Sequence, residues 1–504
     1  MKAKPSPPAP FSLEEAPFIP MPAEIVTDSG SFALSSSTGM SNIGLDKELF
    51  FITDYLTREI NAKTSINFPA IRKNTSLLSN SIHIKLNKDT LNNALEAYQL
   101  HITPDTLTLT AGSPEGIFRG VQTLLQLIPE AKDSIQRDSI KTILLPLGTI
   151  KDAPVFAWRG AMLDVARHFF TVVEVKQYIR LLAAYKINKL HLHLTDDQGW
   201  RIAIDTFPKL SEIGGKTEVG GGEGGYYTKA DYQEIVAFAT KHFITIIPEV
   251  DMPGHTNAAS VAYPFLNGNA KKVKPYTGMK VGFSTFDTRK DTVYDFIETV
   301  IKEISAITPG SYFHIGGDES HVTKEKDYRY FVRKVEQLVK KHGKQMIGWD
   351  EVASVAVDSS TIAQFWNNEV NAKKAVEKGM KVILSPGKKA YLDMKYDKNS
   401  QYGLTWAGYI PIDTAYIWQP ETYAGIPLEN ILGIEAPLWS ETISNLKELE
   451  YLAFPRILGY AELGWTRPEL RNWENYRERL ARQARFLKRK KVNFYSSPLI
   501  DWNY

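Results

Sequence analysis

The stretch ITIIPEVD, residues 244–251, is an apolar run of strand length that ends in acidic residues, and its pattern recurs along most of the chain. Amphipathic segments of helical length separate such runs, for example residues 173–187, 294–307 and 327–343. The other runs are GAMLDVA (160–166), KLHLHLT (189–195), YFHIGGD (312–318), KQMIGWD (344–350), TIAQFWN (361–367), KVILSPG (381–387) and ILGIEAPLW (431–439). Apolar strands that alternate with helices predict a parallel sheet buried on both faces.

Eight such strands suggest a (β/α)₈ barrel, and a doubly wound open sheet is the alternative. An open sheet gathers its chemistry at one switch point, whereas a barrel draws on the C-terminal ends of many strands. Polar or aromatic residues follow nearly every run, from Arg167 after the first to Glu441 after the last. The predicted fold class is therefore α/β, with a catalytic (β/α)₈ TIM barrel preceded by a smaller α/β domain of sheet and helices.

The 504 residues of the chain predict more than one domain. The Pro-rich residues 1–17 are predicted to be a flexible leader. Residues 18–150 alternate between short strands and helices and contain no catalytic constellation, which predicts an N-terminal non-catalytic α/β domain. Residues 151–504 then form the barrel. The basic segment RERLARQARFLKRKK (477–491) is predicted to be the last barrel helix, with a solvated face.

The composition argues against several classes of protein. A formal net charge of +3 is too small for a nucleic-acid or membrane-surface role, which needs a basic face. No apolar run approaches the roughly 18 to 20 residues of a membrane span. The chain has no Cys, which excludes disulfides, thiol catalysis and Cys-ligated metals. We expect an exported bacterial protein, periplasmic or secreted, whose signal peptide this chain lacks, while a cytoplasmic location stays open.

The residues at the predicted strand ends suit a sugar. Carboxylates can accept hydrogen bonds from hydroxyl groups, and indoles can pack on the apolar faces of a pyranose. No metal or other cofactor is needed to explain these side chains. The two His of HLHL (191–194) share one strand face, which we expect to be packed inside the barrel. The glycine run VGGGEGGYY (219–227) does not link a strand to a helix, so it does not predict a dinucleotide site.

Seven motifs occur in order along the barrel: DVARHFF, HLHLTDDQGWR, IIPEVDMPGHT, HIGGDE, GWDE, YLD and APLWSE. Together they resemble the β-N-acetylhexosaminidases of glycoside hydrolase family 20. The preceding segment, with IFRGVQTLLQLI, is similar to that family's non-catalytic N-terminal domain. The resemblance implies an exo-acting, retaining enzyme that removes terminal β-linked GlcNAc or GalNAc from an oligosaccharide or glycoconjugate. Release of a disaccharide unit or of 6-sulfated GlcNAc are alternatives within the family, and Met394 after Asp393 favours neutral sugars.

The adjacent carboxylates of Asp318 and Glu319 are the most informative pair, because neighbours on a strand ordinarily point to opposite faces. The family uses substrate assistance, in which the 2-acetamido oxygen attacks C1 to form an oxazolinium ion. The resemblance implies that Glu319 is the general acid and base and that Asp318 orients the acetamido group. A relay from Asp196 through His255 would tune Glu319, and the Gly-Gly turn would free the pair from strand alternation. Partial burial and the Asp318 charge predict a raised pKa for Glu319.

The resemblance also implies roles for the other strand-end residues. Tyr391 would donate its hydroxyl to the acetamido oxygen, and Arg167 would bind the O3 and O4 hydroxyls. Asp393 and Glu441 would accept hydrogen bonds from O4 and O6. The aromatic residues of the site are Trp349, Trp366 and Trp439, which would enclose the acetamido methyl and the sugar face, and Trp406, a platform for the leaving group.

Two rival functions remain to be weighed. A carbohydrate-binding barrel without activity would lack the Asp-Glu pair or the tyrosine, and both are present here. An ordinary retaining glucosidase or galactosidase would need two catalytic carboxylates on well-separated strands. The sequence leaves open the choice between GlcNAc and GalNAc, the natural glycan and the oligomeric state.

Overall fold

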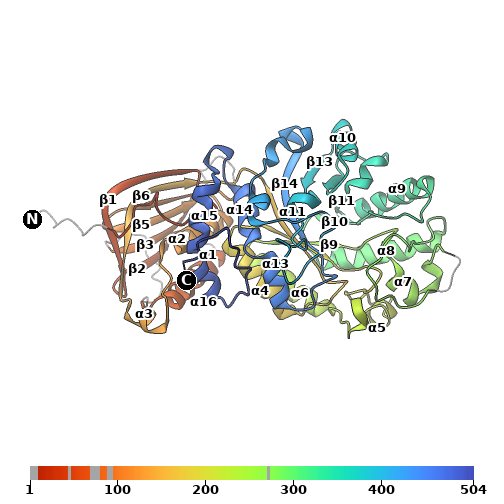
Figure 1. Ribbon diagram of the computed structural model, residues 1–504, viewed down its shortest axis with the longest axis horizontal. Coiled ribbons are helices and arrows are strands. Elements are labelled where there is room, and N and C mark those ends of the chain that lie inside the picture. Colours follow the sequence, from red (N-terminus) through yellow and green to blue (C-terminus); the bar gives the residue numbers. More distant parts are fainter. Residues whose placement is uncertain (1–8, 44–46, 68–79, 88–94, 270–272, 504) are drawn as a thin grey trace, which may run out of the picture.

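The computed structural model describes residues 9–43, 47–67, 80–87, 95–269 and 273–503. Within them the chain forms a sheet domain followed by a barrel, and the two lie side by side (Figure 1). The chain passes from sheet to barrel between Asp152 and Trp158, and the predicted boundary at residue 150 falls inside the last sheet strand. None of the described helices is long and apolar enough to cross a membrane.

Eight parallel strands close into the predicted barrel, and each predicted apolar run supplies one of them. The fold prediction is therefore confirmed. The strands pair in chain order, and the last strand closes the ring by pairing with the first. They are β7 (Trp158–Asp164), β8 (Lys189–His193), β9 (Thr245–Glu249), β10 (Tyr312–His314), β11 (Gln345–Trp349), β12 (Ile362–Phe365), β13 (Lys381–Leu384) and β14 (Ile431–Leu438).

Two of the barrel helices begin at capping boxes that the sequence provides. Thr171 and Glu174 form a reciprocal capping box at the start of α4, and Thr228 and Asp231 do the same for α6. The helices that surround the barrel are α4 (Val172–Ala184), α5 (Lys209–Glu212), α6 (Lys229–Lys241), α7 (Asn257–Ala262), α8 (Asp291–Ala306), α9 (Glu325–Lys341), α10 (Glu369–Glu377), α11 (Gly387–Ala390), α12 (Ile412–Tyr416), α13 (Leu446–Ala453) and α14 (Arg456–Trp465). Short 3₁₀ turns complete the loops at η1 (Val219–Gly221), η2 (Pro264–Leu266), η3 (Asp350–Ser354), η4 (Pro420–Gly425), η5 (Leu428–Asn430) and η6 (Pro468–Leu470).

The N-terminal domain is a six-stranded mixed sheet with the order β1-β6-β4-β5-β3-β2. Helices α1 (Lys47–Lys63) and α2 (Pro114–Leu127) pack together against it, and α3 (Ser134–Ser139) is short. Gly120 allows α2 to approach the sheet closely, because a Cβ there would lie 2.3 Å from Leu109 Cδ1. The strands are β1 (Glu24–Ser35), β2 (Gly39–Ile43), β3 (Ser81–Leu86), β4 (Tyr98–Ile102), β5 (Thr106–Ala111) and β6 (Thr142–Asp152).

Residues 9–17 differ from the flexible leader that their composition predicts. Leu13 and Ala16 are completely or almost completely buried. Gly148 leaves room for Leu13, since a Cβ at this glycine would come within 2.8 Å of Leu13 Cδ1. Apolar burial therefore ties this segment to the body of the protein. Residues 1–8, the rest of the predicted leader, lie outside the described residues.

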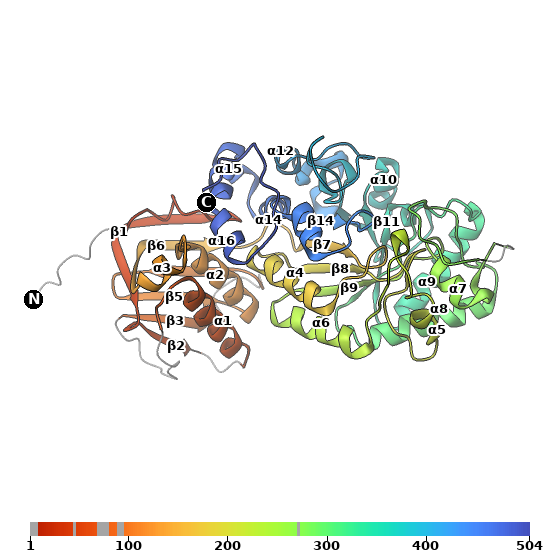
Figure 2. The ribbon, with the colours of Figure 1, turned by 60° about the horizontal axis from the view of Figure 1, so that its bottom comes forward.

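The basic C-terminal segment also differs from its prediction. It forms two helices, α15 (Trp473–Arg482) and α16 (Ala484–Arg489), which come after the helices α13 and α14 that follow the last barrel strand. Both views place α15 and α16 beside the N-terminal domain (Figures 1 and 2). Arg489 and Lys490 form ion pairs with Glu130 and Glu59 of that domain, at 2.6 and 2.7 Å. The basic face is therefore used to join the two domains.

A buried carboxylate also connects the two domains. Glu96 receives a hydrogen bond from Arg119 Nε of α2 at 2.8 Å and one from Arg159 at the start of the barrel. Asn188 Nδ2 of the barrel donates to the second carboxylate oxygen at 3.2 Å. Burial opposes the charge of Glu96, but the charges of the two guanidinium groups outweigh it and lower the pKa to about 2.

We predict that Glu96→Gln lowers the midpoint of thermal unfolding substantially. The substitution removes the counter-charge of the buried Arg159 and the shorter of the two ion pairs of Arg119, which costs on the order of 3–5 kcal/mol. Because the folded-state pKa lies below the ordinary 4.5, this stabilisation is present above pH 4.5 and is lost as the pH falls towards 2. Glu474→Gln is the matched control, since Glu474 forms an exposed pair with Arg477. Equal midpoints for both variants at pH 7 would contradict the prediction.

Candidate active site

The twelve predicted site residues all lie at or beyond the C-terminal ends of barrel strands, as the sequence predicts. Arg167 follows β7, His255 follows β9, and Trp349 is the last residue of β11. The barrel therefore brings together residues that are far apart in the chain. Arg167 and Glu441 are an example, because the charge of the Arg167 guanidinium acts on the buried carboxyl of Glu441. This end of the barrel is the candidate active site.

The backbone after β10 places Asp318 and Glu319 side by side. Gly316 and Gly317 have φ values of +66° and +96°, and Glu319 itself has a φ of +43°. A Cβ at Gly316 would lie 1.9 Å from Oδ1 of Asp251, so only glycine fits there. The left-handed turn removes the alternation of a regular strand, as predicted. The positive φ of a glutamate is uncommon, and such strain is concentrated at functional sites.

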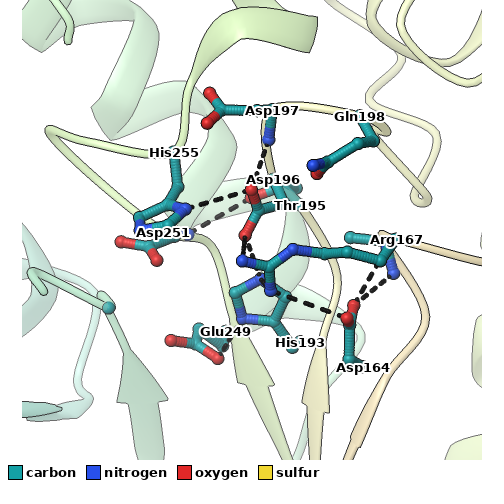
Figure 3. Close-up of polar contacts among 12 residues, drawn as sticks. Asp164, Arg167, His193, Thr195, Asp196, Asp197, Gln198, Glu249, Asp251 and His255 are labelled. Atoms are coloured by element: carbon teal, nitrogen blue, oxygen red, sulfur yellow. Dashed lines mark hydrogen bonds and ion pairs between the residues drawn. The ribbon is translucent and has the colours of Figure 1, made fainter. Parts of the chain in front are cut away.

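His255 lies between Asp196 on one side of its ring (Figure 3) and the carboxyl pair of Asp318 and Glu319 on the other. His255 Nδ1 lies 3.0 Å from Asp196 Oδ1. On the other side of the ring, Nε2 lies 3.6 Å from Glu319 Oε2 and 3.9 Å from Asp318 Oδ2. The predicted order Asp196–His255–Glu319 therefore has the geometry of a relay, and Asp318 lies beside its last member.

The charges around this relay hold His255 in its protonated form. Burial lowers the pKa of His255, but Asp196 and Asp251 outweigh burial and raise the pKa well above its ordinary value. Asp196 is itself kept ionised, because Arg167 and His255 overcome the effect of burial and lower its pKa. Arg167 Nη2 lies 2.9 Å from Asp196 Oδ2 (Figure 3). The relay therefore carries an imidazolium against the carboxylate pair.

This imidazolium makes the predicted pKa of Glu319 wrong for the free protein. Burial raises the pKa of Glu319, but its interaction with the protonated His255, 3.6 Å away, outweighs burial and leaves the pKa below the ordinary value. Asp318 behaves in the opposite way. Its deeper burial, together with the charge of Glu319, exceeds the opposing effect of His255 and raises its pKa to about 6. In the empty site Asp318 is therefore the weaker acid of the two.

Asp251 is a site residue to which the sequence alone assigned no role. It is buried directly beyond β9, and its Oδ1 accepts a hydrogen bond from Gly317 N at 2.9 Å. Burial and the neighbouring charge of Asp318 raise the pKa of Asp251 well above its ordinary value. Asp251 therefore supports the turn that carries Asp318. Its position directly after an apolar run, like that of Asp196, was the available signal.

Five aromatic side chains form a continuous wall. Trp349 Nε1 donates to Glu249 at 2.9 Å, and its ring centroid lies 5.7 Å from that of Trp439. The ring centroid of Tyr391 lies 6.3 Å from that of Trp439, 5.6 Å from that of Trp406 and 6.4 Å from that of Trp366, with which it is stacked. Burial and the charges of nearby carboxylates raise the pKa of Tyr391, so its hydroxyl stays protonated and can donate.

The outer end of this wall is open to solvent. Trp406 is 54% exposed, whereas Trp349 is completely buried and Trp439 is 8% exposed. Gly387 permits the close approach of Trp406, because a Cβ there would lie 3.1 Å from the indole Cη2. The aromatic surface therefore extends from the buried end of the site to its rim.

The remaining predicted residues carry polar atoms that the protein leaves unpaired. Both carboxylate oxygens of Asp393, Oε2 of Glu441 and Nε of Arg167 lack a hydrogen-bond partner among the described residues. Burial and the charge of Glu441 raise the pKa of Asp393 well above its ordinary value. Buried polar atoms are nearly always paired in folded proteins. This cluster therefore has free donors and acceptors for a hydroxylated ligand.

Arg167 is held in place from several sides. Its guanidinium lies over the Trp439 ring at 4.8 Å and pairs with Asp164 at 3.5 Å in addition to Asp196. These contacts fix the plane of the guanidinium. Because the protein leaves its Nε unpaired, one edge can still donate to a ligand oxygen.

The histidines of the HLHL motif are packed inside the barrel beneath the site, as predicted. His191 lies between Glu249 and Glu435, at 2.9 and 2.8 Å, and His193 Nδ1 is 2.5 Å from Glu249 Oε2. His191, Glu249 and His314 offer ligand atoms within 4.8 Å of one another, as a metal site would. Glu249 is already engaged by His193 and Trp349, so a hydrogen-bonded network accounts for the cluster.

Comparisons with known proteins agree with this geometry. The model described as glycosyl hydrolase family 20, catalytic domain, matches residues 156–468, and that for domain 2 of the same family matches residues 15–153. A β-N-acetylhexosaminidase of Cellulomonas fimi is 40% identical over 413 residues, which cover 81% of this chain and 82% of the relative. A β-hexosaminidase of Porphyromonas gingivalis is 33% identical over 92% of this chain and 62% of its own length.

A solved structure extends the likeness to the whole chain. The N-acetyl-β-hexosaminidase of Streptomyces plicatus, in complex with Thio-NAglucal, is 41% identical and matches with a TM-score of 0.92 over 99% of each chain. The two family models together span the sheet domain and most of the barrel. The chain therefore belongs to glycosyl hydrolase family 20 and is a glycoside hydrolase.

Proposed function

We propose that this protein is an exo-acting, retaining β-N-acetylhexosaminidase that removes terminal β-linked GlcNAc or GalNAc from oligosaccharides or glycoconjugates. The observation that carries the proposal is the adjacency of Asp318 and Glu319 beside a single imidazole nitrogen. A glycosidase with its own nucleophile holds two carboxyls on opposite sides of the scissile bond, about 5–5.5 Å apart. Two carboxyls on one turn suit a substrate that supplies the nucleophile itself.

Glu319 acts first as the general acid. It gives its proton to the glycosidic oxygen while the acetamido oxygen of the substrate attacks C1, and the bond between C1 and the leaving oxygen breaks. Glu319 then takes a proton from water, whose oxygen attacks C1 and opens the oxazolinium ring with overall retention. The side chain of Glu319 is 28% exposed, in keeping with its position between the buried sugar and the departing group.

Asp318 accepts a hydrogen bond from the acetamido N–H and stabilises the positive charge that develops on that group. This role requires the ionised form of Asp318 and the protonated form of Glu319, which is the reverse of their order in the empty site. Binding of an N–H donor to Asp318 favours its ionised form. The bound substrate itself therefore shifts the proton from Asp318 towards Glu319, and His255 lies close to both carboxyls for the transfer.

The aromatic wall positions the acetamido group. Trp349, Trp366 and Trp439 enclose its methyl, and the Tyr391 hydroxyl donates to its oxygen. Holding a nucleophile against the reacting carbon can contribute several kcal/mol, roughly 7–11 at most. Arg167, with the carboxyls of Asp393 and Glu441, binds the ring hydroxyls, and Trp406 supports the leaving group from the rim of the site.

We predict that an aryl N-acetyl-β-glucosaminide is cleaved at least about 10²–10³-fold faster than the matching aryl β-glucoside. The acetamido oxygen is the nucleophile, so its replacement by a hydroxyl removes a reacting group and its positioning. The measurement is kcat/KM for both substrates with the same leaving group. Comparable values would mean that the protein supplies its own nucleophile.

We predict that Asp318→Asn and Glu319→Gln respond differently to the leaving group. General acid catalysis contributes about 10²–10⁴-fold for a poor leaving group and little for a 2,4-dinitrophenyl group, which needs no proton. Glu319→Gln should therefore lose much more activity towards a methyl or disaccharide glycoside than towards the dinitrophenyl glycoside in the first chemical step. Asp318→Asn should slow both by similar factors. If the two variants showed the same dependence on the leaving group, the roles assigned to Asp318 and Glu319 would be contradicted.

We predict that kcat/KM falls about tenfold per pH unit above pH 6, because the carboxyl pair of the free enzyme then loses the single proton that the bound substrate moves from Asp318 to Glu319. The imidazolium of His255 stabilises the Asp318 carboxylate and so lowers its pKa. His255→Gln should therefore move this alkaline limb to higher pH. Asp318→Asn should abolish the limb near pH 6. A limb that His255→Gln leaves unmoved would contradict the assignment.

A further inference from the structure

A second cavity lies at the junction of the two domains, outside the barrel. Its volume is about 490 Å³, within the range of roughly 300–1,000 Å³ that small-molecule sites occupy. It is bordered by α1 and α2 of the N-terminal domain, by α4 and α6 of the barrel, and by α15 and α16. Figure 2 shows these helices at the junction. None of the active-site residues described above lines this cavity.

Aromatic rings supply the apolar wall of the cavity. Phe51 and Tyr55 come from α1, Phe238 from α6 and Phe486 from α16. The rings of Phe51 and Tyr55 are 6.4 Å apart, and Phe238 lies 4.3 Å from the ring of His242. Residues from both domains thus present flat apolar surfaces to the same space. Such surfaces suit the flat apolar body of a small ligand.

A buried amide in the lining is left without a partner. Gln122 of α2 is only 2% exposed, and its Nε2 has no hydrogen-bond acceptor among the described residues. Its other terminal atom accepts a long hydrogen bond of 3.4 Å from Tyr55. An unpaired buried donor costs folding free energy, and a ligand oxygen would remove that cost.

Two arginines of the lining, Arg180 and Arg485, give the cavity an excess of positive charge. Other cations at this junction are neutralised, as Lys63 is by Glu130 at 2.8 Å. Arg180 and Arg485 form no ion pair among the described residues, and the buried Nε of Arg485 has no hydrogen-bond partner there. Burial together with the charges of Arg180 and Arg58 lowers the pKa of His242. An anionic group would compensate these charges.

We propose that this cavity binds a small amphipathic anion. The apolar body lies between the rings of the two domains, an acceptor oxygen takes the hydrogen bond from Gln122 Nε2, and a carboxylate, sulfate or phosphate faces Arg180 and Arg485. The ligand is independent of the glycan in the active site. Because it contacts both domains, its binding raises the midpoint of thermal unfolding.

Dansylglycine is the probe for this site. Its naphthalene ring, sulfonyl oxygens and carboxylate correspond to the aromatic wall, to Gln122 and to the arginines. Fluorescence titration of the full chain should show one saturable site whose affinity excess N-acetylglucosamine does not change. Dansylamide, which has the same rings but no carboxylate, should bind at least tenfold more weakly.

Two substitutions separate the charge contribution from the amide contribution. The double variant Arg180→Gln/Arg485→Gln should weaken dansylglycine at least tenfold and leave dansylamide unchanged, whereas the matched control Arg333→Gln on α9 should change neither. Gln122→Leu should weaken both probes, because it removes the amide that donates to the ligand oxygen. Competition by N-acetylglucosamine, several equivalent sites, or affinity that is insensitive to both the arginine and the glutamine substitutions would overturn the proposal.

Discussion

The close contact between the Gly316–Gly317 turn and Asp251 is the constraint on which the site depends. A Cβ at Gly316 would lie 1.9 Å from the Asp251 carboxylate, so the chain can leave β10 only in a conformation that glycine allows. That turn sets Asp318 and Glu319 beside one another and against His255. Two carboxyls with one partner then titrate as a pair, in which burial decides which of them keeps the proton.

The barrel interior supports this arrangement electrostatically. His191, His193 and Trp349 surround Glu249, and the second nitrogen of His193 lies 2.8 Å from Asp196. Asp196 is thereby fixed between this network, Arg167 and His255. Buried charges are tolerated only where they are paired and hydrogen-bonded. The interior network therefore does more than fill the barrel, because it orients the relay that ends at Glu319.

Substrate and protein together complete the catalytic site. Asp318 is the weaker acid of the pair, and in the proposed mechanism an N–H donor from the substrate favours its ionised form, so that Glu319 carries the proton. In the proposed mechanism, a ligand without the acetamido group is therefore a poor substrate for two reasons. It lacks the nucleophilic oxygen, and it lacks the N–H that donates to Asp318. This coupling links specificity to chemistry without a separate recognition element.

The sequence alone determined the barrel, the order of its strands and the residues at their ends. Local patterns are sufficient for these features, because an apolar run predicts a strand buried on both faces and the Gly-Gly pair predicts the turn after β10. The sequence could not determine how distant segments meet. Leu13 is buried because Gly148 leaves space for it, and the basic C-terminal residues pair with Glu59 and Glu130 of the other domain. The lowered pKa of Glu319 likewise arises from an imidazolium that Asp196 holds in place, and only the tertiary structure brings these three residues together.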